Sequence, residues 1–436
     1  MRKLSLIMAV LPFSLACQES NKQTSQTDTL STAYNQELSL PEPNPDGAKN
    51  KFSKVIGWPE GKTPVAPAGF TVTKFASDTK SPRNIYIAPN GDVFVVLSNT
   101  ERSGKEKIEA VVTGKAKSEQ GGKSANTVIL FRDTNNDGKP DLQSEFLTGL
   151  NQPYGVLVIG NSFYVANTDG LWKYPYKPGD IAISEKGTKI MDLPAGGYNN
   201  HWTRNLIANA DNSKIYITVG SGSNVGENGM EHEKNRANIL EINPDGTGMN
   251  IYASGLRNPV GMAWAPGSSV LWTAVNERDG LGDDLVPDYI TSVQKGAFYG
   301  WPYAYFGAHE DPRMKGQRPD LVKKTIKPDI AVGSHTASLG LAFYTGNKFP
   351  ATYQDGVFIG QHGSWNRSAL SGYKVAFIPF KGGKQAGPMK DFLTGFIADL
   401  DKAEVYGRPV GVAVAKDGAL LVADDVSNTV WRVAAN

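Results

Sequence analysis

Cysteine is almost absent from this sequence of 436 residues, in which Cys17 is the only one. The chain therefore forms no internal disulfide and has no cysteine-based zinc site, and without a CxxCH motif it carries no covalently bound haem. An excess of one charge is missing too, since 45 lysine and arginine residues face 43 aspartate and glutamate residues. This balance argues against a nucleic-acid-binding protein, in which basic residues are concentrated.

Long apolar runs are also missing, because no segment approaches the ~20 residues of a membrane-spanning helix. Arg2 and Lys3 precede a shorter apolar segment that ends at residue 16. This pattern is typical of a secretory signal peptide over residues 1–17, and we expect the protein to be exported. Cys17 stands where a bacterial lipoprotein is cleaved and lipidated, although ordinary cleavage near Ala16 remains open. The protein would then be periplasmic or a lipoprotein attached to a membrane.

Residues 18–55 are rich in Ser, Thr, Gln, Asn and Pro, which predicts a flexible linker. The rest of the chain, residues 56–436, is rich in glycine and aromatic residues, which favours many short strands joined by tight turns.

A pair of apolar strands joined by a polar turn recurs six times, at a mean spacing of about 65 residues. The six pairs cover residues 84–96, 155–167, 205–219, 261–275, 340–360 and 411–423. Asn-Gly and Asp-Gly turns between apolar alternations are strong hairpin signals, and each repeat has room for two further strands. The pattern predicts an all-β fold, a six-bladed β-propeller of four-stranded antiparallel blades. A set of β-sandwich domains is the alternative.

Polar side chains precede the first strand and follow the second strand of most repeats. In a propeller both positions lie at one mouth of the central channel, where loops on a rigid scaffold carry function. Three of the five histidines, His201, His335 and His362, belong to this set. Arginines such as Arg257 and Arg408 bind carboxylates, so the mouth suits a flat, polyanionic ligand. Each residue taken alone also fits a purely structural role in a turn.

Several of these segments together resemble one enzyme family, the PQQ-dependent sugar dehydrogenases. The group includes the soluble quinoprotein glucose and aldose dehydrogenases and the sorbosone dehydrogenase-like proteins. The resemblance extends from about residue 60 to the C-terminus. The segments that carry it are Asn199-Asn200-His201-Trp202, Arg257-Asn258-Pro259, Asn276-Glu277-Arg278-Asp279, Tyr299-Gly300-Trp301-Pro302, His335-Thr336-Ala337-Ser338, residues 360–367 and Gly407-Arg408-Pro409.

The resemblance implies that the chain binds pyrroloquinoline quinone (PQQ) and Ca²⁺, and that it oxidises an aldose or related sugar aldehyde at the anomeric carbon to a lactone or acid. It implies that His201 is the general base. The implied cofactor-binding residues are Gln152, Arg257, Asn258, His335, Thr336, His362, Trp365, Arg367 and Arg408. Because the chain has no haem, the electrons would pass to an external acceptor, a quinone or a cytochrome.

The implied calcium ligands are mainly backbone carbonyl groups of Glu277, Arg278 and Asp279. The glucose enzymes have Gly-Pro where this chain has Arg278-Asp279. A second candidate ion site is the segment with Asp133, Asn135, Asp137 and Asp141, whose spacing is that of a calcium loop. A structural ion and an ion-free hairpin turn rich in Asp and Asn are both compatible with that segment.

Two other functions are compatible with a propeller of this kind. One is a calcium-dependent sugar lactonase, in which a metal-bound water attacks the lactone. The other is a binding module without catalysis that holds a glycan or a peptide at its mouth.

Overall fold

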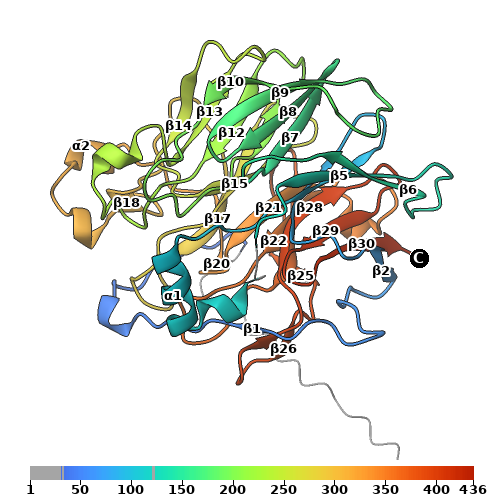
Figure 1. Ribbon diagram of the computed structural model, residues 1–436. Helices are drawn as coiled ribbons and strands as arrows, with labels where there is room; N and C mark the ends of the chain where they lie inside the picture. The colour runs from blue at the N-terminus through green and yellow to red at the C-terminus, as the bar shows by residue number, and fades with distance from the viewer. Residues whose placement is uncertain (1–30, 32–33, 120–122) are drawn as a thin grey trace, which may run out of the picture.

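Antiparallel sheets make up most of the computed structural model, which describes residue 31 and residues 34–119 and 123–436 (Figure 1). The predicted signal peptide lies outside these residues. Within them, α-helix is limited to α1 (Gly104–Thr113) and α2 (Pro319–Val322). No described helix is long and apolar enough to cross a membrane. The prediction of an all-β fold is confirmed.

All six predicted strand pairs form antiparallel hairpins. Glycine in a left-handed conformation closes several of the turns, as Gly91 does with φ of +95° after Asn90. The hairpins are β3 (Pro82–Ile87) with β4 (Val93–Leu97), β7 (Gly155–Ile159) with β8 (Ser162–Asn167), β11 (Leu206–Ala208) with β12 (Ile215–Val219), β15 (Pro259–Trp264) with β16 (Leu271–Val275), β21 (Ser338–Phe343) with β22 (Gly356–Gln361), and β28 (Pro409–Val414) with β29 (Leu420–Asp424).

Each hairpin is extended into a sheet of four or five strands, so that the described residues contain six such sheets. In five of them the added strands follow the hairpin in the chain. These strands are β5 (Thr127–Arg132) and β6 (Leu142–Leu147), β9 (Gly170–Pro175) and β10 (Thr188–Asp192), β13 (Asn238–Ile242) and β14 (Asn250–Ser254), β17 (Pro287–Ser292) and β20 (Ile330–Ser334), and β23 (Lys374–Lys381) with β24 (Lys384–Gln385) and β25 (Lys390–Leu393).

The sixth sheet joins the two ends of the chain. After β28 and β29 it continues with β30 (Thr429–Ala435), and its outermost strand is β2 (Phe70–Ala76), the first strand of the six sheets in sequence. β2 and β30 are antiparallel from Phe70↔Ala435 to Ala76↔Val430, so blue and red strands lie side by side in Figure 1. Separating β2 from β30 would therefore break this sheet.

The first strand of each of the six hairpins contacts the first strand of the next. The order is β3, β7, β11, β15, β21 and β28, and β28 contacts β3. Glycines allow this close approach. A Cβ atom on Gly340 would lie 2.2 Å from the Val410 carbonyl oxygen, and one on Gly155 would lie 2.5 Å from the Leu206 nitrogen. Real carbon atoms do not approach so closely, hence these positions require glycine.

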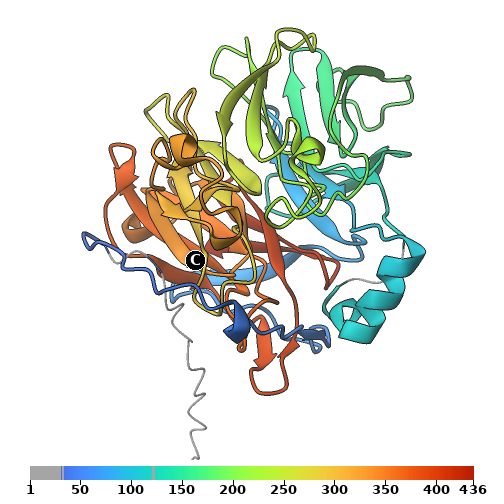
Figure 2. The same ribbon diagram turned by 90° about the vertical axis from the view of Figure 1, so that its left-hand side faces the viewer.

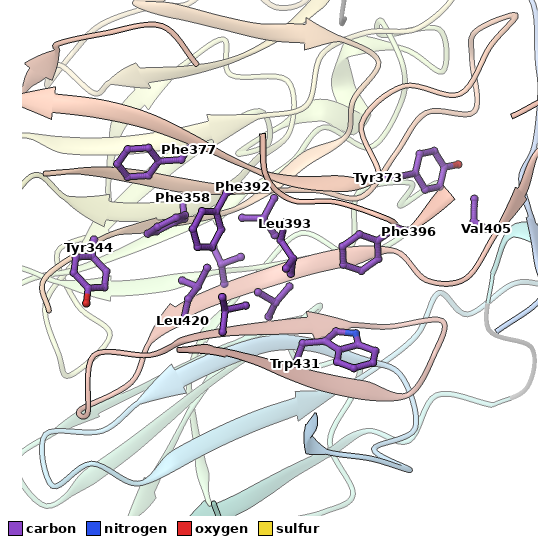
Figure 3. Packing of buried hydrophobic residues seen from close by; sticks show 14 of the residues in the cluster. Tyr344, Phe358, Tyr373, Phe377, Phe392, Leu393, Phe396, Val405, Leu420 and Trp431 are labelled. Atoms are coloured by element: carbon purple, nitrogen blue, oxygen red, sulfur yellow. The ribbon is translucent and has the colours of Figure 1, made fainter. Parts of the chain in front are cut away.

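Apolar side chains pack between neighbouring sheets. The cluster in Figure 3 joins the fifth and sixth sheets and includes Phe358, Phe392, Leu420 and Trp431. Phe358 and Phe392 lie with ring centroids 4.6 Å apart, and Trp431 is fully buried. Burial of such large side chains from alternate positions of the strands supplies the main driving force for stacking the sheets.

Shorter elements complete the described structure. They are the paired strands β1 (Lys54–Val55), β26 (Ile397–Asp399) and β27 (Glu404–Val405), the pair β18 (Ala304–Tyr305) and β19 (His309–Glu310), and the 3₁₀ helices η1 (Pro45–Gly47), η2 (Lys115–Ser118), η3 (Met230–Glu233), η4 (Pro312–Met314) and η5 (Ala351–Tyr353).

The second half of the predicted linker packs on the sheets. The Asn44 nitrogen donates to the Leu281 carbonyl oxygen, β1 pairs with β27, and Ser53 is buried. Figure 2 shows this N-terminal segment in blue beneath the sheets, on the side where helix α1 also lies. The polar composition of residues 18–55 predicted no such contacts. A few apolar side chains and backbone hydrogen bonds are enough to hold a segment in place, and overall composition does not reveal them.

Candidate active site

One cavity opens where the six sheets meet, and we call it the mouth cavity. It is lined by residues that precede first strands or follow second strands, as the repeat pattern predicted for loops at a shared mouth. The lining residues of this kind are Asn99, His201, Asn258, Asn276, Ala337, His362, Arg408 and Asp425, and Arg83 joins them from the start of β3. Together they come from five of the six sheets.

The floor of the mouth cavity is apolar. Trp202 and Leu339 line the cavity and belong to a buried cluster with Tyr154, Val260 and Val410. Each of these five side chains comes from the beginning of a different first strand or from the segment that leads into it. The cluster gives the cavity a dry base, so that polar interactions above it are weakly screened.

His201 lies at the wall of the mouth cavity and is 9% exposed. Its Nδ1 atom is 2.9 Å from the Ser221 carbonyl oxygen and 3.0 Å from the Ser221 hydroxyl oxygen. The hydroxyl group itself donates to the Ser223 carbonyl oxygen, so Nδ1 is the donor in both contacts. This assignment leaves Nε2 as the basic nitrogen of the neutral ring. Burial, and then the nearby Arg257, lower the pKa of His201 well below 6.5.

Arg83, Asp425 and His362 form a second polar group in the mouth cavity. Arg83 pairs with Asp425 at 2.5 Å, and His362 Nε2 lies 3.0 Å from both carboxylate oxygens of Asp425. Burial and the neighbouring Arg408 lower the pKa of His362 to about 4, so this histidine is neutral and donates through Nε2. Burial alone would raise the pKa of Asp425, but His362 and Arg83 hold it below its usual value.

Arg408 is buried in the same wall, with its charge directed at backbone oxygens. Its guanidinium donates to the carbonyl groups of His362, Gly363 and Ser118 at 2.8–3.0 Å. Arg408, which directly precedes β28, therefore fixes the loop between β22 and β23. Arg83, the second residue of β3, was missed in the sequence, although its place at the start of a first strand was a usable signal.

The segment between β4 and β5 forms one rim of the cavity. Arg102 and Lys115 line it, with Arg102 paired to Glu119. The stacked pair of Phe52 and Trp365 also lines the cavity, with ring centroids 5.6 Å apart at an interplanar angle of 1°. Lys115 Nζ lies 5.6 Å from the Trp365 ring centroid. The sequence alone indicated Trp365 but gave no sign that Phe52 or the inserted segment reached the mouth.

A second cavity, which we call the side cavity, adjoins the first and shares Trp202, Asp279 and Trp365 with it. Helix α1 supplies one wall. Gln152 lies here rather than in the mouth cavity, and its Nε2 donates to the Asn99 carbonyl oxygen at 3.0 Å.

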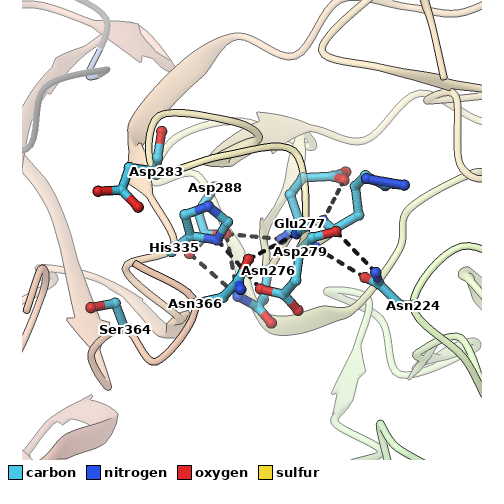
Figure 4. Close-up of polar contacts among 12 residues, drawn as sticks. Asn224, Asn276, Glu277, Asp279, Asp283, Asp288, His335, Ser364 and Asn366 are labelled. Carbon is cyan, nitrogen blue, oxygen red and sulfur yellow. Dashed lines mark hydrogen bonds and ion pairs between the residues drawn. The ribbon is translucent and has the colours of Figure 1, made fainter. Parts of the chain in front are cut away.

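Asp279 lines both cavities and lies at the centre of a polar network (Figure 4). Its two carboxylate oxygens accept from Arg257 at 3.2 Å and from His335 Nδ1 at 3.3 Å. His335 Nε2 lies 3.0 Å from the Gly282 carbonyl oxygen, so both ring nitrogens face acceptors. Although burial alone would lower it, the bonds to Asp279 raise the pKa of His335. Burial alone would raise the pKa of Asp279, but His335 and Arg257 lower it.

Several residues implied as cofactor contacts lie behind the cavity lining. Arg257 is 1% exposed, and Thr336 is fully buried with its hydroxyl 3.0 Å from an Asp288 carboxylate oxygen. Arg367 pairs with Asp284 at 3.2 Å. The structure thus brings His201, Asn258, His362, Trp365 and Arg408 together at the mouth cavity, and it places Arg257, His335, Thr336 and Arg367 in the supporting layer.

A family model described as a domain of unknown function (DUF7133) matches residues 62–431. The chain belongs to this family. Over 294 residues it is 32% identical to an uncharacterized protein of Borreliella burgdorferi, a match that covers 65% of this chain and 76% of that protein.

Sugar dehydrogenases are also similar to this chain. The aldose sugar dehydrogenase YliI of Escherichia coli is 37% identical over 195 residues, which cover 41% of this chain and 49% of the enzyme. The chain thus spans about half the length of that relative. The holo PQQ domain of pyranose dehydrogenase from Coprinopsis cinerea has the same fold, with a TM-score of 0.67 at 19% identity over 88% of this chain and 100% of that domain. The resemblance to PQQ-dependent sugar dehydrogenases is confirmed.

In this member of the family the segment implied for calcium is already occupied by hydrogen bonds. Of the three implied carbonyl groups, that of Glu277 accepts from Arg257 and that of Asp279 accepts from Asn224, and the neighbouring Asn276 carbonyl oxygen also accepts from Arg257. Arg278 pairs with Asp311 at 2.9 Å. Among the described residues no group of three or more histidine or acidic side chains is arranged to hold a metal ion. These contacts do not fit a calcium ion at residues 277–279.

The segment with the spacing of a calcium loop, residues 133–141, connects β5 to β6. Asp133 accepts from the backbone nitrogens of Asn136 and Gly138 at 2.7 Å. Asp141 accepts from the Thr134 nitrogen and hydroxyl, and Asn135 and Asp137 accept from nearby backbone nitrogens. These are the bonds of a turn rich in Asp and Asn. A structural ion at this segment stays a prediction.

Proposed function

We propose that this protein is a PQQ-dependent dehydrogenase that oxidises an aldose or related sugar aldehyde at the anomeric carbon. The observation that carries the proposal is His201, a buried neutral histidine held by Ser221 at the wall of a cavity that also contains Arg83, Arg102, Lys115 and Arg408. A base and a set of cations in one concave site suit a hydroxyl substrate beside a polyanionic cofactor. The similarity to sugar dehydrogenases supports this assignment.

We further propose that the six sheets are the blades of a six-bladed β-propeller. The cyclic contacts of the first strands and the closure of β2 on β30 support this arrangement. The mouth cavity would then lie at one end of the central channel.

The donor set of the mouth cavity fits a planar tricarboxylate such as PQQ. Lys115 supplies positive charge at the lining, Arg83 and Arg102 add N–H donors although they are paired with Asp425 and Glu119, and Phe52 with Trp365 supplies a flat aromatic rim. Arginine and aromatic faces are the groups that hold such ligands. When bound, the quinone would accept hydride from the anomeric carbon.

His201 would take the proton of the anomeric hydroxyl group on Nε2 while the C–H bond of the same carbon breaks. The bond from Nδ1 to Ser221 keeps the ring in the required tautomer and orientation. The carbon thereby becomes the carbonyl carbon of a lactone, and a hydrated aldehyde would give an acid in the same way. The apolar floor around Trp202 and Leu339 excludes water beneath the reacting groups.

The two electrons would leave to an external acceptor, a quinone or a cytochrome. Export, and membrane attachment through a lipidated Cys17, are part of the same proposal, because such acceptors are found at the bacterial envelope. Mass spectrometry of the N-terminal peptide from bacterial membranes tests the attachment, and an unmodified peptide that starts after Ala16 would exclude it.

Reconstitution of the purified full chain tests the enzymatic function. PQQ is added to the protein, and reduction of a dye is followed with a panel of aldoses. Turnover that depends on PQQ and is lost in His201→Gln, but kept in His232→Gln, supports the proposal, since His232 is exposed. Hydrolysis of sugar lactones without quinone would instead indicate the lactonase, and glycan or peptide binding without turnover would indicate the binding module.

A further inference from the structure

A buried side chain already places a positive charge at the segment implied for calcium. Arg257 is 1% exposed and lies directly behind Asn276 and Asp279, two residues that line the mouth cavity. The guanidinium bonds to the carbonyl oxygens of Asn276 and Glu277 at 3.2 Å and 2.6 Å.

Every N–H group of this guanidinium has an acceptor. Besides the two carbonyl groups, Nε donates to the Asn224 backbone oxygen at 3.1 Å, and the remaining nitrogen reaches the Asn224 side-chain oxygen at 2.9 Å and the Asp279 carboxylate at 3.2 Å. Asn224 in turn holds both the backbone nitrogen and the backbone oxygen of Asp279 at 2.9 Å. The geometry is therefore complete without a further cation.

A calcium ion at this place would need six to eight oxygen ligands at 2.3–2.6 Å. The carbonyl oxygens of Asn276, Glu277 and Asp279 would have to leave their donors, and both carboxylate oxygens of Asp279 are taken by Arg257 and His335. Displacing a buried guanidinium would leave its N–H groups without acceptors, and keeping it beside a divalent cation would bring like charges together.

We infer that the Arg257 guanidinium takes the place of the calcium ion, so that this chain binds its quinone cofactor without calcium. The inference rests on the proposed function, because the cofactor is that of the proposed reaction. Arg257 acts as a positioning residue that fixes the Asn276–Asp279 loop and supplies fixed positive charge beneath it. The replacement of Gly-Pro by Arg278-Asp279 is consistent with this arrangement, because Asp279 contributes the carboxylate that balances Arg257.

Binding measurements on the full chain test this inference without relying on turnover. Protein freed of metal is titrated with PQQ in EGTA and, separately, in 5 mM CaCl₂, and binding is followed by quenching of tryptophan fluorescence. We expect dissociation constants that agree within about twofold. A loss of affinity of tenfold or more in EGTA would overturn the inference, and absence of PQQ binding in both buffers would overturn the proposed function instead.

A titration with calcium alone tests the inference without the quinone. Isothermal titration with CaCl₂ is performed on Asp133→Asn, which weakens the other candidate ion site, and no submillimolar binding is expected. Submillimolar calcium binding that is abolished by Asp279→Asn would contradict the inference. Arg257→Ala should weaken PQQ binding at least tenfold in EGTA, whereas Arg132→Ala, a remote arginine paired with Asp92, should leave it unchanged. Because Arg257→Ala can also unfold the loop, Arg257→Lys, which keeps the charge, should retain more of the affinity than Arg257→Ala in the same titration.

Discussion

Arg83 and Asp425 pair at 2.5 Å across the boundary between the first and last sheets, although they are 342 residues apart in the chain. Arg83 lies in β3, and Asp425 directly follows β29. The pair is nearly buried. Both residues line the mouth cavity, and their contact links the first sheet to the sixth.

Removal of one charge from this pair should destabilise the fold. Asp425→Asn leaves Arg83 without its counter-charge and replaces one of the two oxygens that accept from His362 with an NH₂ group, and breaking a buried pair in this way costs about 3–5 kcal/mol. Denaturation with guanidinium chloride measures the loss. The control is Asp417→Asn, which breaks the more exposed pair with Arg432 and should cost no more than about 1 kcal/mol. Equal effects of both variants would contradict the importance of the buried pair.

Close packing of β22 against β28 predicts a sharp difference between two glycines. Gly360→Ala would place a Cβ atom 2.0 Å from the Val410 carbonyl oxygen, so the sheets must move apart at a cost of about 1–3 kcal/mol or more. Gly196→Ala, in open space with an ordinary φ, should change the free energy of unfolding by less than about 0.5 kcal/mol. Thermal melting of both variants against the wild type tests this, and a stable Gly360→Ala protein would mean that the strands are less tightly packed.

Trp58 ties the segment before β2 to the last sheet through one hydrogen bond. Its indole nitrogen donates to the Asp424 carboxylate at 2.9 Å, and Trp431 donates to the same oxygen at 3.1 Å. Trp58→Phe should lower the free energy of unfolding by about 1.5–3 kcal/mol, since the lost bond was to a charged group. Trp172→Phe is the matched control, because the Trp172 nitrogen has no partner among the described residues. Urea denaturation should show the smaller loss for Trp172→Phe.

The low pKa of His201 predicts how activity and stability depend on pH. Since burial, and then Arg257, hold the pKa of His201 well below 6.5 in the folded chain, kcat/KM should decline only as the pH falls through that lowered value and not where a free histidine titrates. The same shift favours protonation of the unfolded chain. The stability that neutral His201 contributes is thus fully present above pH 6.5 and is lost as the pH falls through its folded-state value. A stability difference between wild type and His201→Gln that is independent of pH from 4 to 8 would contradict this.

The sequence by itself determined the elements of this protein. Alternating apolar residues around turns such as Asn90-Gly91 and Asp417-Gly418 identified all six hairpins, because strand period and turn chemistry are local properties. The same pattern brought His201, Asn258, His362 and Arg408 to one mouth, since their places before or after the strands fix their end of the sheet.

Only the tertiary structure decided which side chains face the cavity and which support it. Arg257 and Asn258 are neighbours in the chain, yet Asn258 lines the mouth cavity and Arg257 is committed to carbonyl groups behind it. Phe52 reaches the rim from a segment whose composition predicted a linker. The sequence did not predict this contact because the stacking partner, Trp365, is more than 300 residues away. Such pairings depend on the closure of distant segments on one another, and no local pattern encodes that closure.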